Sequence, residues 1–453
     1  MEKRRRFPKF FISHNPMIAV ILGFLLIILF GAFLLMLPIS NRSGAWLSPL
    51  SALFTATSAT CVTGLTVGDP YTMFTFFGQL VILCMIQVGG LGFMSFAMIL
   101  MMTFRKAISF GERMLLSSSL GLSSAGGILS FVRLVVGGTF LLEGIGALLL
   151  SFYFIPEYQF FPGLWKAIFL SVSAFCNAGF DILGNGDSLV ALQNNGYVLS
   201  ILMILTIIGG LGFWVWKELL SRKSLRQISI YAKMVLMSTA VLLVFGTVFY
   251  LAVEWNNPAT IGNMSVGGKI LNAAFSSVTM RTAGFASFDM AMLREPSKLI
   301  SGLLMFIGGS SGSTAGGIKT VTFLVIMITA IQVACGRNKI HVHGRTIAQN
   351  DIFRAFSLLA IAVSIVFASS LVTYFLTPGA HLIDMFFNCV SAFGTVGVAS
   401  YNIAAMNAAA QIILMLLMFM GRLGILSITI AIMIRLNQNK DKISYPKANI
   451  LIG

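Results

Sequence analysis

This chain of 453 residues contains little charge. Only 10% of its residues are Asp, Glu, Lys or Arg, whereas 57% are hydrophobic. A soluble domain carries about 25% charged residues, so the composition excludes an ordinary soluble protein and predicts a membrane protein. The first long apolar segment, Met17–Leu37, is too long for a signal peptide and lacks its small-residue cleavage site. We therefore expect it to remain as a membrane span.

Residues that carry catalytic or metal-binding chemistry are also scarce. The five cysteines lie in or next to apolar segments without metal-ligand spacing, which is typical of buried small side chains rather than disulfides or zinc sites. Glu143 is the only acid within a predicted span, and the four histidines fall in flanking polar regions. A membrane enzyme and a proton relay are therefore both disfavoured.

The net charge of +16 follows the expected membrane topology. Most Lys and Arg gather in five segments that hold only five of the 14 acids, and most of the other acids lie in the polar segments between them. This positive-inside pattern predicts a multi-pass protein with both termini in the cytoplasm, and it explains the basic excess without nucleic acid. The basic segments are Met1–Pro16, Phe104–Arg133, Lys217–Lys233, Gly336–Arg354 and Arg435–Gly453.

Four similar segments recur along the chain, each containing a glycine at the same register. They are Ser58–Leu65, Ser173–Phe180, Val278–Phe285 and Ser391–Val398, and their glycines are 105 to 115 residues apart. Glycine lets a backbone turn its carbonyl groups inward without a Cβ clash, as an ion selectivity filter requires. We predict that potassium is bound by backbone carbonyls in a filter of Val62, Thr63, Gly64, Asn177, Ala178, Gly179, Thr282, Ala283, Gly284, Thr395, Val396 and Gly397.

The side chains of these segments bear on selectivity. None is acidic at a filter position, which argues against a carboxylate ring for divalent ions. Arg281 is the single charge, and we expect it to point behind the filter and to bond to carbonyls or an acid. Cys61 and Cys176 occupy the same register and should also point away.

The glycine segments divide the chain into four units, each with a spanning helix (M1), a short pore helix and a second span (M2). The predicted helices are 17–37, 50–60 and 73–103; 134–155, 164–175 and 194–216; 232–253, 268–279 and 299–335; and 356–376, 382–393 and 408–434. The short helices cannot cross a bilayer and must be re-entrant. The fold class is therefore an all-α membrane protein with eight transmembrane helices and four pore loops around one pseudo-four-fold pore. Its regions are 1–16 (N-terminus), 17–105, 106–220 (with a cytoplasmic connector), 221–336, 337–435 and 436–453 (C-terminal tail).

Each M2 segment contains a glycine motif, and the third motif is the longest. The motifs begin at Gly89, Gly209, Gly308 and Gly421. In the first two units, close helix packing is a sufficient explanation. The third motif should interrupt its helix, because each glycine costs about 1 kcal/mol relative to alanine, and a broken segment in a membrane must line a cavity. It comprises Gly308, Gly309, Ser310, Ser311, Gly312, Ser313, Thr314, Ala315, Gly316 and Gly317. It also resembles a phosphate loop, but Ile318 intervenes before Lys319.

The whole chain resembles the Trk/Ktr/HKT superfamily of cation translocation subunits, and in particular the KtrB-type membrane subunit of bacterial potassium uptake systems. The resemblance rests on four M1–pore loop–M2 units, each with a single filter glycine. Plant relatives often have serine at the first filter position and favour sodium, so Gly64 resembles the potassium-selecting pattern. In this superfamily the segment matching Gly308–Gly317 is an intramembrane gating loop, and the arginine matching Arg422 is an electrostatic barrier. A charge in mid-span is functional by default on physical grounds as well.

The resemblance implies further properties. It implies potassium translocation across the bacterial plasma membrane by a homodimer, one pore per subunit, docked on a cytosolic nucleotide-binding regulatory ring of the KtrA/RCK type. Dependence on sodium ion is a superfamily trait without a recognisable site in this sequence, and no cofactor is expected to be bound covalently. Contact with membrane lipid explains the basic loops equally well. The alternatives are a secondary cation symporter of the same fold and a less selective potassium/sodium channel.

Overall fold

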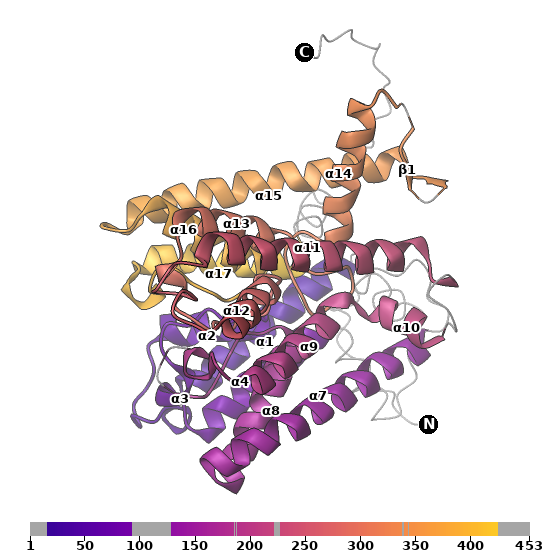
Figure 1. Cartoon of the computed structure of the whole chain (residues 1–453). Coiled ribbons are helices and arrows are strands. Elements are labelled where there is room, and N and C mark those ends of the chain that lie inside the picture. Colours follow the sequence, from indigo (N-terminus) through magenta and orange to yellow (C-terminus); the bar gives the residue numbers. More distant parts are fainter. Residues whose placement is uncertain are drawn as a thin grey trace, which may run out of the picture.

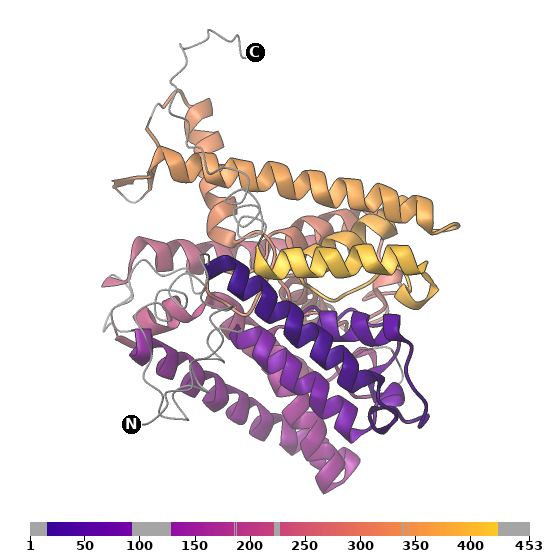
Figure 2. The same cartoon turned by 180° about the vertical axis from the view of Figure 1, so that it is seen from behind.

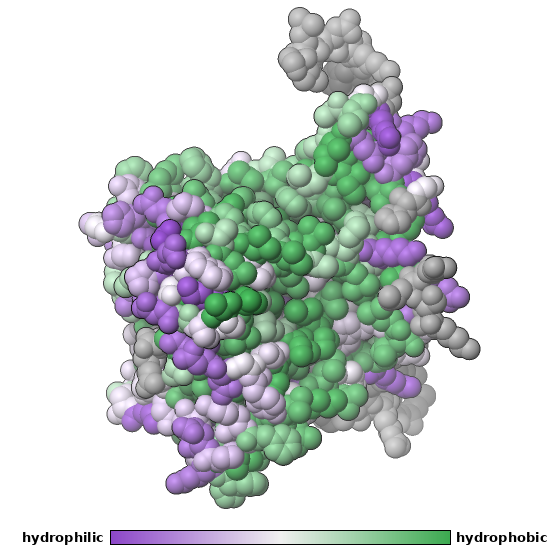
Figure 3. Space-filling view, viewed as in Figure 1, coloured by the Kyte–Doolittle hydropathy of each residue, from purple (hydrophilic) through white to green (hydrophobic). Residues whose placement is uncertain are grey.

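The chain forms a bundle of helices. The computed structural model describes residues 16–92, 128–221 (apart from 185 and 187), 227–342 (apart from 338) and 344–424. One small antiparallel hairpin, β1 (His341–Val342) with β2 (Arg345–Thr346), interrupts an otherwise helical architecture. Hydrophobic residues cover the middle of the face seen in Figure 3, and hydrophilic residues lie along two opposite edges. In the described part, α7, α11 and α15 are long and apolar enough to span a membrane.

Each predicted unit contains a long first helix, a short helix and a second helix. The first unit has α1 (Pro16–Met36), α2 (Pro49–Thr60) and α4 (Phe76–Leu91), with the short turn α3 (Pro70–Met73) before α4. The second has α7 (Ile128–Tyr158), α8 (Phe160–Cys176), α9 (Gly196–Leu211) and α10 (Phe213–Ser221). The third has α11 (Ile230–Glu254), α12 (Val266–Thr279), α13 (Glu295–Phe306) and α14 (Thr320–Ala334). The fourth has α15 (Gln349–Leu376), α16 (Leu382–Gly394) and α17 (Ala408–Leu423).

The short helices are arranged around a common centre. The second helix of each unit packs on the short helix of the next: α4 on α8, α9 on α12, α13 on α16, and α17 on α2. The last contact closes the cycle, and Figure 2 shows α17 (yellow) beside the N-terminal helices (indigo). The C-terminal ends of α2, α8, α12 and α16 lead directly into the four glycine segments.

The second helices are more broken than the sequence predicted. The third stops at Phe306 and resumes at Thr320, as expected, with α13 and α14 running in different directions (Figure 1). The second was predicted to be continuous over 194–216. Instead, α9 and α10 meet at a bend of 94°. Gly212, between them, has φ of +91°, a conformation that ends a right-handed helix.

The first and fourth second helices end in the same way. Gly92 (φ +80°) and Gly424 (φ +82°) follow the last residues of α4 and α17. The rest of the predicted spans, to residues 103 and 434, lies outside the described residues, as does the predicted connector as far as residue 127.

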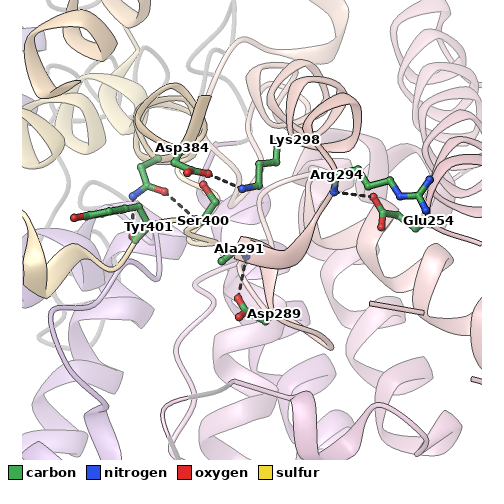
Figure 4. Close-up of polar contacts among 9 residues, drawn as sticks. Glu254, Asp289, Ala291, Arg294, Lys298, Asp384, Ser400 and Tyr401 are labelled. Carbon is green, nitrogen blue, oxygen red and sulfur yellow. Dashed lines mark hydrogen bonds and ion pairs between the residues drawn. The ribbon is translucent and has the colours of Figure 1, made fainter. Parts of the chain in front are cut away.

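A polar network joins the third and fourth units near one edge of the bundle (Figure 4). Lys298 Nζ of α13 lies 2.6 Å from Asp384 Oδ1 of α16, and both side chains are about 10% exposed. Glu254, at the end of α11, accepts hydrogen bonds from the Arg294 backbone N–H (3.1 Å) and the Ser297 hydroxyl (2.5 Å) at the start of α13. Asn388 of α16 donates to Tyr401 O and accepts from Ser400 N, both at 2.9 Å. These contacts position α16 and the chain that follows its glycine segment.

The Lys298–Asp384 pair yields a stability prediction. Lys298→Met should leave the buried Asp384 carboxylate without its cation, at a cost of about 3–5 kcal/mol. We expect a lower Tm for the purified protein in detergent, and recovery in the double variant Lys298→Met/Asp384→Leu. The control is Arg354→Met, because Arg354 forms an exposed pair with Asp351 at 3.8 Å, and such pairs contribute about 1 kcal/mol or less. Equal effects of the two single variants would contradict the prediction.

Candidate functional site

The four glycine segments share one unusual backbone conformation. The residue two positions before each glycine has positive φ, and so does the glycine, whereas the residue between them does not. A positive φ is uncommon for residues other than glycine, so the surrounding structure must hold the non-glycine member of each pair in this conformation. The φ values are 57° and 96° for Val62 and Gly64, 59° and 67° for Asn177 and Gly179, 74° and 86° for Thr282 and Gly284, and 51° and 106° for Thr395 and Gly397.

The ends of the short helices hold this conformation. In three units the residue before the glycine donates its backbone N–H to the serine carbonyl five residues earlier, as in a Schellman helix cap. These bonds are Thr63 N to Ser58 O (2.8 Å), Ala178 N to Ser173 O (2.7 Å) and Val396 N to Ser391 O (2.9 Å). In the third unit Ala283 N bonds instead to Thr279 O, at 2.9 Å. The hydroxyls of Ser58 and Ser391 also accept from the glycine N–H of their own segments, both at 3.1 Å.

The four segments form a closed ring. A Cβ added to each glycine would lie too close to the carbonyl oxygen that precedes the glycine of the next segment. The distances are 2.5 Å from Gly64 to Ala178 O, 2.9 Å from Gly179 to Ala283 O, 2.4 Å from Gly284 to Val396 O and 2.1 Å from Gly397 to Thr63 O. The structure therefore brings all four predicted filter segments together, and glycine is required by both backbone conformation and space.

The side chains of the ring residues turn away into the protein. Val62, Asn177, Thr282 and Thr395 are almost fully buried, as are the four residues that follow them. The Asn177 amide and the Thr282 hydroxyl lie 3.3 Å apart and join the second and third segments. This leaves the backbone as the part of each segment that faces the ring.

Glycines of the second helices allow close packing against the ring. A Cβ on Gly89, Gly209 or Gly421 would lie about 2 Å from the carbonyl oxygen of Thr60, Phe175 or Phe393, respectively. Each of these carbonyls belongs to the last turn of the short helix in the same unit. The packing explanation predicted for the first two units therefore also applies to the fourth.

The Gly308–Gly317 segment is hydrogen-bonded to the second unit. Ser310 N donates to Gly210 O (3.2 Å), Thr314 N to Gly209 O (3.4 Å) and the Thr314 hydroxyl to Phe175 O (3.3 Å). In return, Phe213 N donates to Gly312 O at 2.9 Å. The Ser310 hydroxyl also donates to Leu211 O. The break in α9–α10 thus exposes backbone groups that pair with this segment.

The same segment contacts the ring and accepts a hydrogen bond from the side chain of Arg422. A Cβ on Gly316 would lie 2.3 Å from the Thr395 hydroxyl, so the segment contacts the fourth filter segment. Arg422, from α17, donates to Thr314 O and to the carbonyls of Gly89 and Gly90. One side chain therefore connects the fourth unit with the first and with the interrupted helix of the third. The bond from Arg422 to Thr314 O is also what a purely structural role, holding the interrupted segment in place, would require.

Comparison with known proteins places this geometry in a family. The family model described as "TrkH: Cation transport protein" matches residues 3–443. The chain belongs to the TrkH cation transport family. This is a family of membrane transport proteins, as expected from the scarcity of catalytic residues. The match covers nearly the whole chain, including all four glycine segments.

Individual relatives agree with the family assignment. The chain is 36% identical to the potassium/sodium uptake protein NtpJ of Enterococcus hirae over 444 residues, 97% of each chain. It is also 36% identical to the Ktr system potassium uptake protein B of Bacillus subtilis over 442 residues, 98% of each chain. The crystal structure of the potassium transporter TrkH from Vibrio parahaemolyticus has the same fold, with a TM-score of 0.71 at 16% identity. That likeness covers 95% of this chain and 86% of the other.

Two basic residues, Lys319 and Arg281, differ in part from the sequence-based expectation. Lys319, noted in the sequence only as part of a false phosphate loop, donates to Ala315 O at 2.8 Å and so belongs to the interrupted segment. A lysine between apolar helices was a signal for this role. Arg281 is buried and points behind the ring, as predicted. The expected carbonyl or acidic partner of its guanidinium is not found among the described residues.

Glu143, the acid within a span, lies behind the second short helix. Its carboxylate accepts from Gln87 Nε2 at 3.1 Å and from the Cys176 thiol at 3.6 Å. Cys176 therefore points away from the ring, as predicted.

The chain that follows each ring segment contributes a second repeated feature. Asp69, Asp289 and Asn402 each stand five residues after their glycine and accept a hydrogen bond from the backbone N–H two residues later, at 2.9 to 3.0 Å. The second unit has Asp181 two residues after its glycine, with Leu183 N donating to its carboxylate at 3.2 Å. Three carboxylates therefore lie in the chain just after the ring segments, and their negative charge favours cations there.

Asp181 is the titratable member of this group. Burial, with a smaller contribution from Asp69, raises the pKa of Asp181 to about 6, against the opposing effects of the Leu183 N–H, Lys166 and the Ser188 hydroxyl. Lys166 lies nearby, with its Nζ donating to Leu183 O at 3.0 Å. Asp181 is therefore negative above pH 6 and neutral well below it.

This pKa predicts a pH dependence of cation uptake. As the pH on the side of the ring that contains Asp181 falls through about 6, Asp181 should become protonated, and the KM for the transported cation should rise. One charge at about 10 Å in water changes the local cation concentration about twofold. We expect uptake kinetics to show this rise in the native protein but not in Asp181→Asn. A pH profile that is identical in the two proteins would contradict it.

Proposed function

We propose that this chain translocates potassium ions across the plasma membrane of a bacterium through the ring of four glycine segments. The observation that carries the proposal is the closed ring, in which the glycine of each segment approaches a backbone carbonyl of the next while the neighbouring side chains are buried in the protein. Potassium gives up its water only where oxygen ligands replace it, and carbonyls from four segments can do so. The names of relatives that are 36% identical over nearly their full length support potassium as a substrate.

The proposed topology has eight membrane spans and four re-entrant short helices, with both termini in the cytoplasm. Charge distribution supports it, because the basic segments alternate with those that contain most of the acids. The short helices support it as well, since α2, α8, α12 and α16 have only 12, 17, 14 and 13 residues, respectively, too few to cross a bilayer.

The Gly308–Gly317 segment and Arg422 together form the proposed gate. The segment lies against Thr395 of the ring and is held there by Arg422 and by carbonyls of the second unit. Its flexible composition favours movement, and the positive charge of Arg422 opposes cations that have passed the ring. Lys319 adds a second basic side chain beside the segment.

Regulation and assembly follow from the family resemblance. The proposed assembly is a homodimer on a cytosolic nucleotide-binding ring of the RCK type, with sodium ion as an activator. The basic hairpin β1–β2 between α14 and α15 is one surface that such a ring, or anionic lipid, would contact. The runner-up function is a less selective potassium/sodium pathway, which is supported by the relative named for uptake of both ions.

Selectivity should depend on Gly64. Gly64→Ser forces a side chain toward Ala178 O, 2.5 Å from the Cβ position, in a backbone with φ of +96°. We expect a lower potassium-to-sodium uptake ratio in a transport-deficient host. The control is Gly44→Ser, because Gly44 also has positive φ (+65°) but has nothing within 4 Å of its Cβ position. An unchanged ratio in a folded Gly64→Ser protein would refute the filter assignment for the first unit.

Flux should depend on the gate. Deleting residues 308–317 should raise the maximal rate of potassium uptake, because it removes the barrier beneath the ring. Lowering the free-energy barrier by about 1.4 kcal/mol raises the rate about tenfold, so the loss of even a modest barrier is measurable.

Two point variants guard against a deletion that fails to fold. Arg422→Gln should also raise the rate, since it removes both the charge and the link to Thr314 O. Arg354→Gln, at an exposed arginine, should not. The gate proposal fails if folded deletion and Arg422→Gln proteins both transport at the native rate.

A further inference from the structure

A small cavity lies directly behind the third ring segment. It gives the centre of a water molecule about 10 Å³ of space. Residues from α9, α11, α12 and the interrupted segment surround it, and none of them is a predicted filter residue. The lining includes Thr206, Gly210, Thr239, Val278, Arg281 and Gly309.

Arg281 brings an uncompensated charge into this cavity. The residue is 8% exposed, and its buried Nε has no hydrogen-bond partner. The other guanidinium nitrogens have no acidic or carbonyl partner in the part of the chain that the structure describes. Buried charges are normally paired, because an isolated charge in a low-dielectric region is costly. The usual structural reason for a buried arginine is therefore missing here.

The position of Arg281 relative to the ring is set by covalent geometry. It immediately precedes Thr282, so its Cα lies about 3.8 Å from that of a ring residue. The same register in the other units holds Cys61, Cys176 and Gly394, all of them uncharged. The third unit alone places a positive side chain behind its ring segment.

The cavity fits water better than an anion. A space of this size holds about one water molecule, which needs two to four polar partners. The guanidinium and the Thr206 and Thr239 hydroxyls can supply them, whereas a chloride ion is larger than water. Water would solvate Arg281 without cancelling its charge.

We propose that Arg281 is a fixed positive charge, solvated by water in this cavity, that weakens cation binding in the ring and so speeds cation release. The inference rests on the proposed function, because it requires the ring to bind the transported ion. A pore conducts only if each ion binds weakly enough to leave. Arg281 acts through its field, without touching the ion, and so affects all monovalent cations alike.

The test is uptake kinetics of the full-length protein with potassium and rubidium. The variants are Arg281→Gln, Arg281→Cys and Arg281→Lys; cysteine is the residue that the first two units have at this register. For charges about 10 Å apart in surroundings of intermediate polarity, the neutral variants should lower KM by roughly 4- to 16-fold. We expect both ions to be affected in parallel, with a lower maximal rate, and Arg281→Lys to retain native kinetics.

Three results would overturn the proposal. One is an unchanged KM in folded neutral variants. Another is Arg281→Lys behaving like Arg281→Gln, which indicates a structural role of the guanidinium. A third is unequal KM shifts for potassium and rubidium, which indicate a distorted ring rather than a lost field.

An anion test covers the remaining occupant of the cavity. Uptake is compared in chloride and in gluconate, which is too large for the cavity. If the KM of the native protein depends on chloride and that of Arg281→Gln does not, a bound anion neutralises Arg281 and the proposal is wrong. Failure of the filter assignment is recognised separately, by an unchanged potassium-to-sodium ratio in Gly64→Ser.

Discussion

The close approach of four backbone segments around one centre is the constraint on which the rest of the structure depends. Each ring glycine faces a carbonyl of the next segment at a distance that leaves no room for a Cβ. The alternating φ values, the Schellman ends of the short helices and the serines beneath them all maintain this backbone. The M2 glycines extend the same requirement outward, because they let three second helices touch the carbonyl ends of the short helices.

The symmetry of the ring is not maintained below it, where the second helices break or end, or behind its segments. Below the ring, the third unit has an interrupted helix, the second has a sharp bend, and Arg422 of the fourth joins the first and third. Behind the ring, the third unit alone has an arginine where the others have cysteine or glycine. Binding an ion needs four similar sets of oxygens, whereas controlling its passage needs a few groups that can move or carry charge. A chain with four units on one polypeptide can vary each unit separately to do both.

Much of the fold was predictable because each unit repeats a strong local signal. Long apolar segments predict the first helices, and the filter glycines mark the ends of the short helices to within a few residues. The bend at Gly212 was missed because its motif, Gly209–Phe213, is equally consistent with close packing in a continuous helix. Its backbone groups are satisfied by the Gly308–Gly317 segment, about 100 residues away, and no local pattern reveals such a partner.

The sequence by itself determined the four-fold repeat, the glycines of the ring, the interrupted third helix and the charge of Arg422, because each depends on residue type and spacing. Only the tertiary structure decided which groups meet. It showed that Arg422 bonds to carbonyls of two other units, that Lys319 belongs to the interrupted segment, and that Arg281 faces a cavity instead of a partner. The hydrogen bonds of Arg422 and Lys319 end on backbone carbonyls, which every residue carries, so their partners are set by packing and not by sequence.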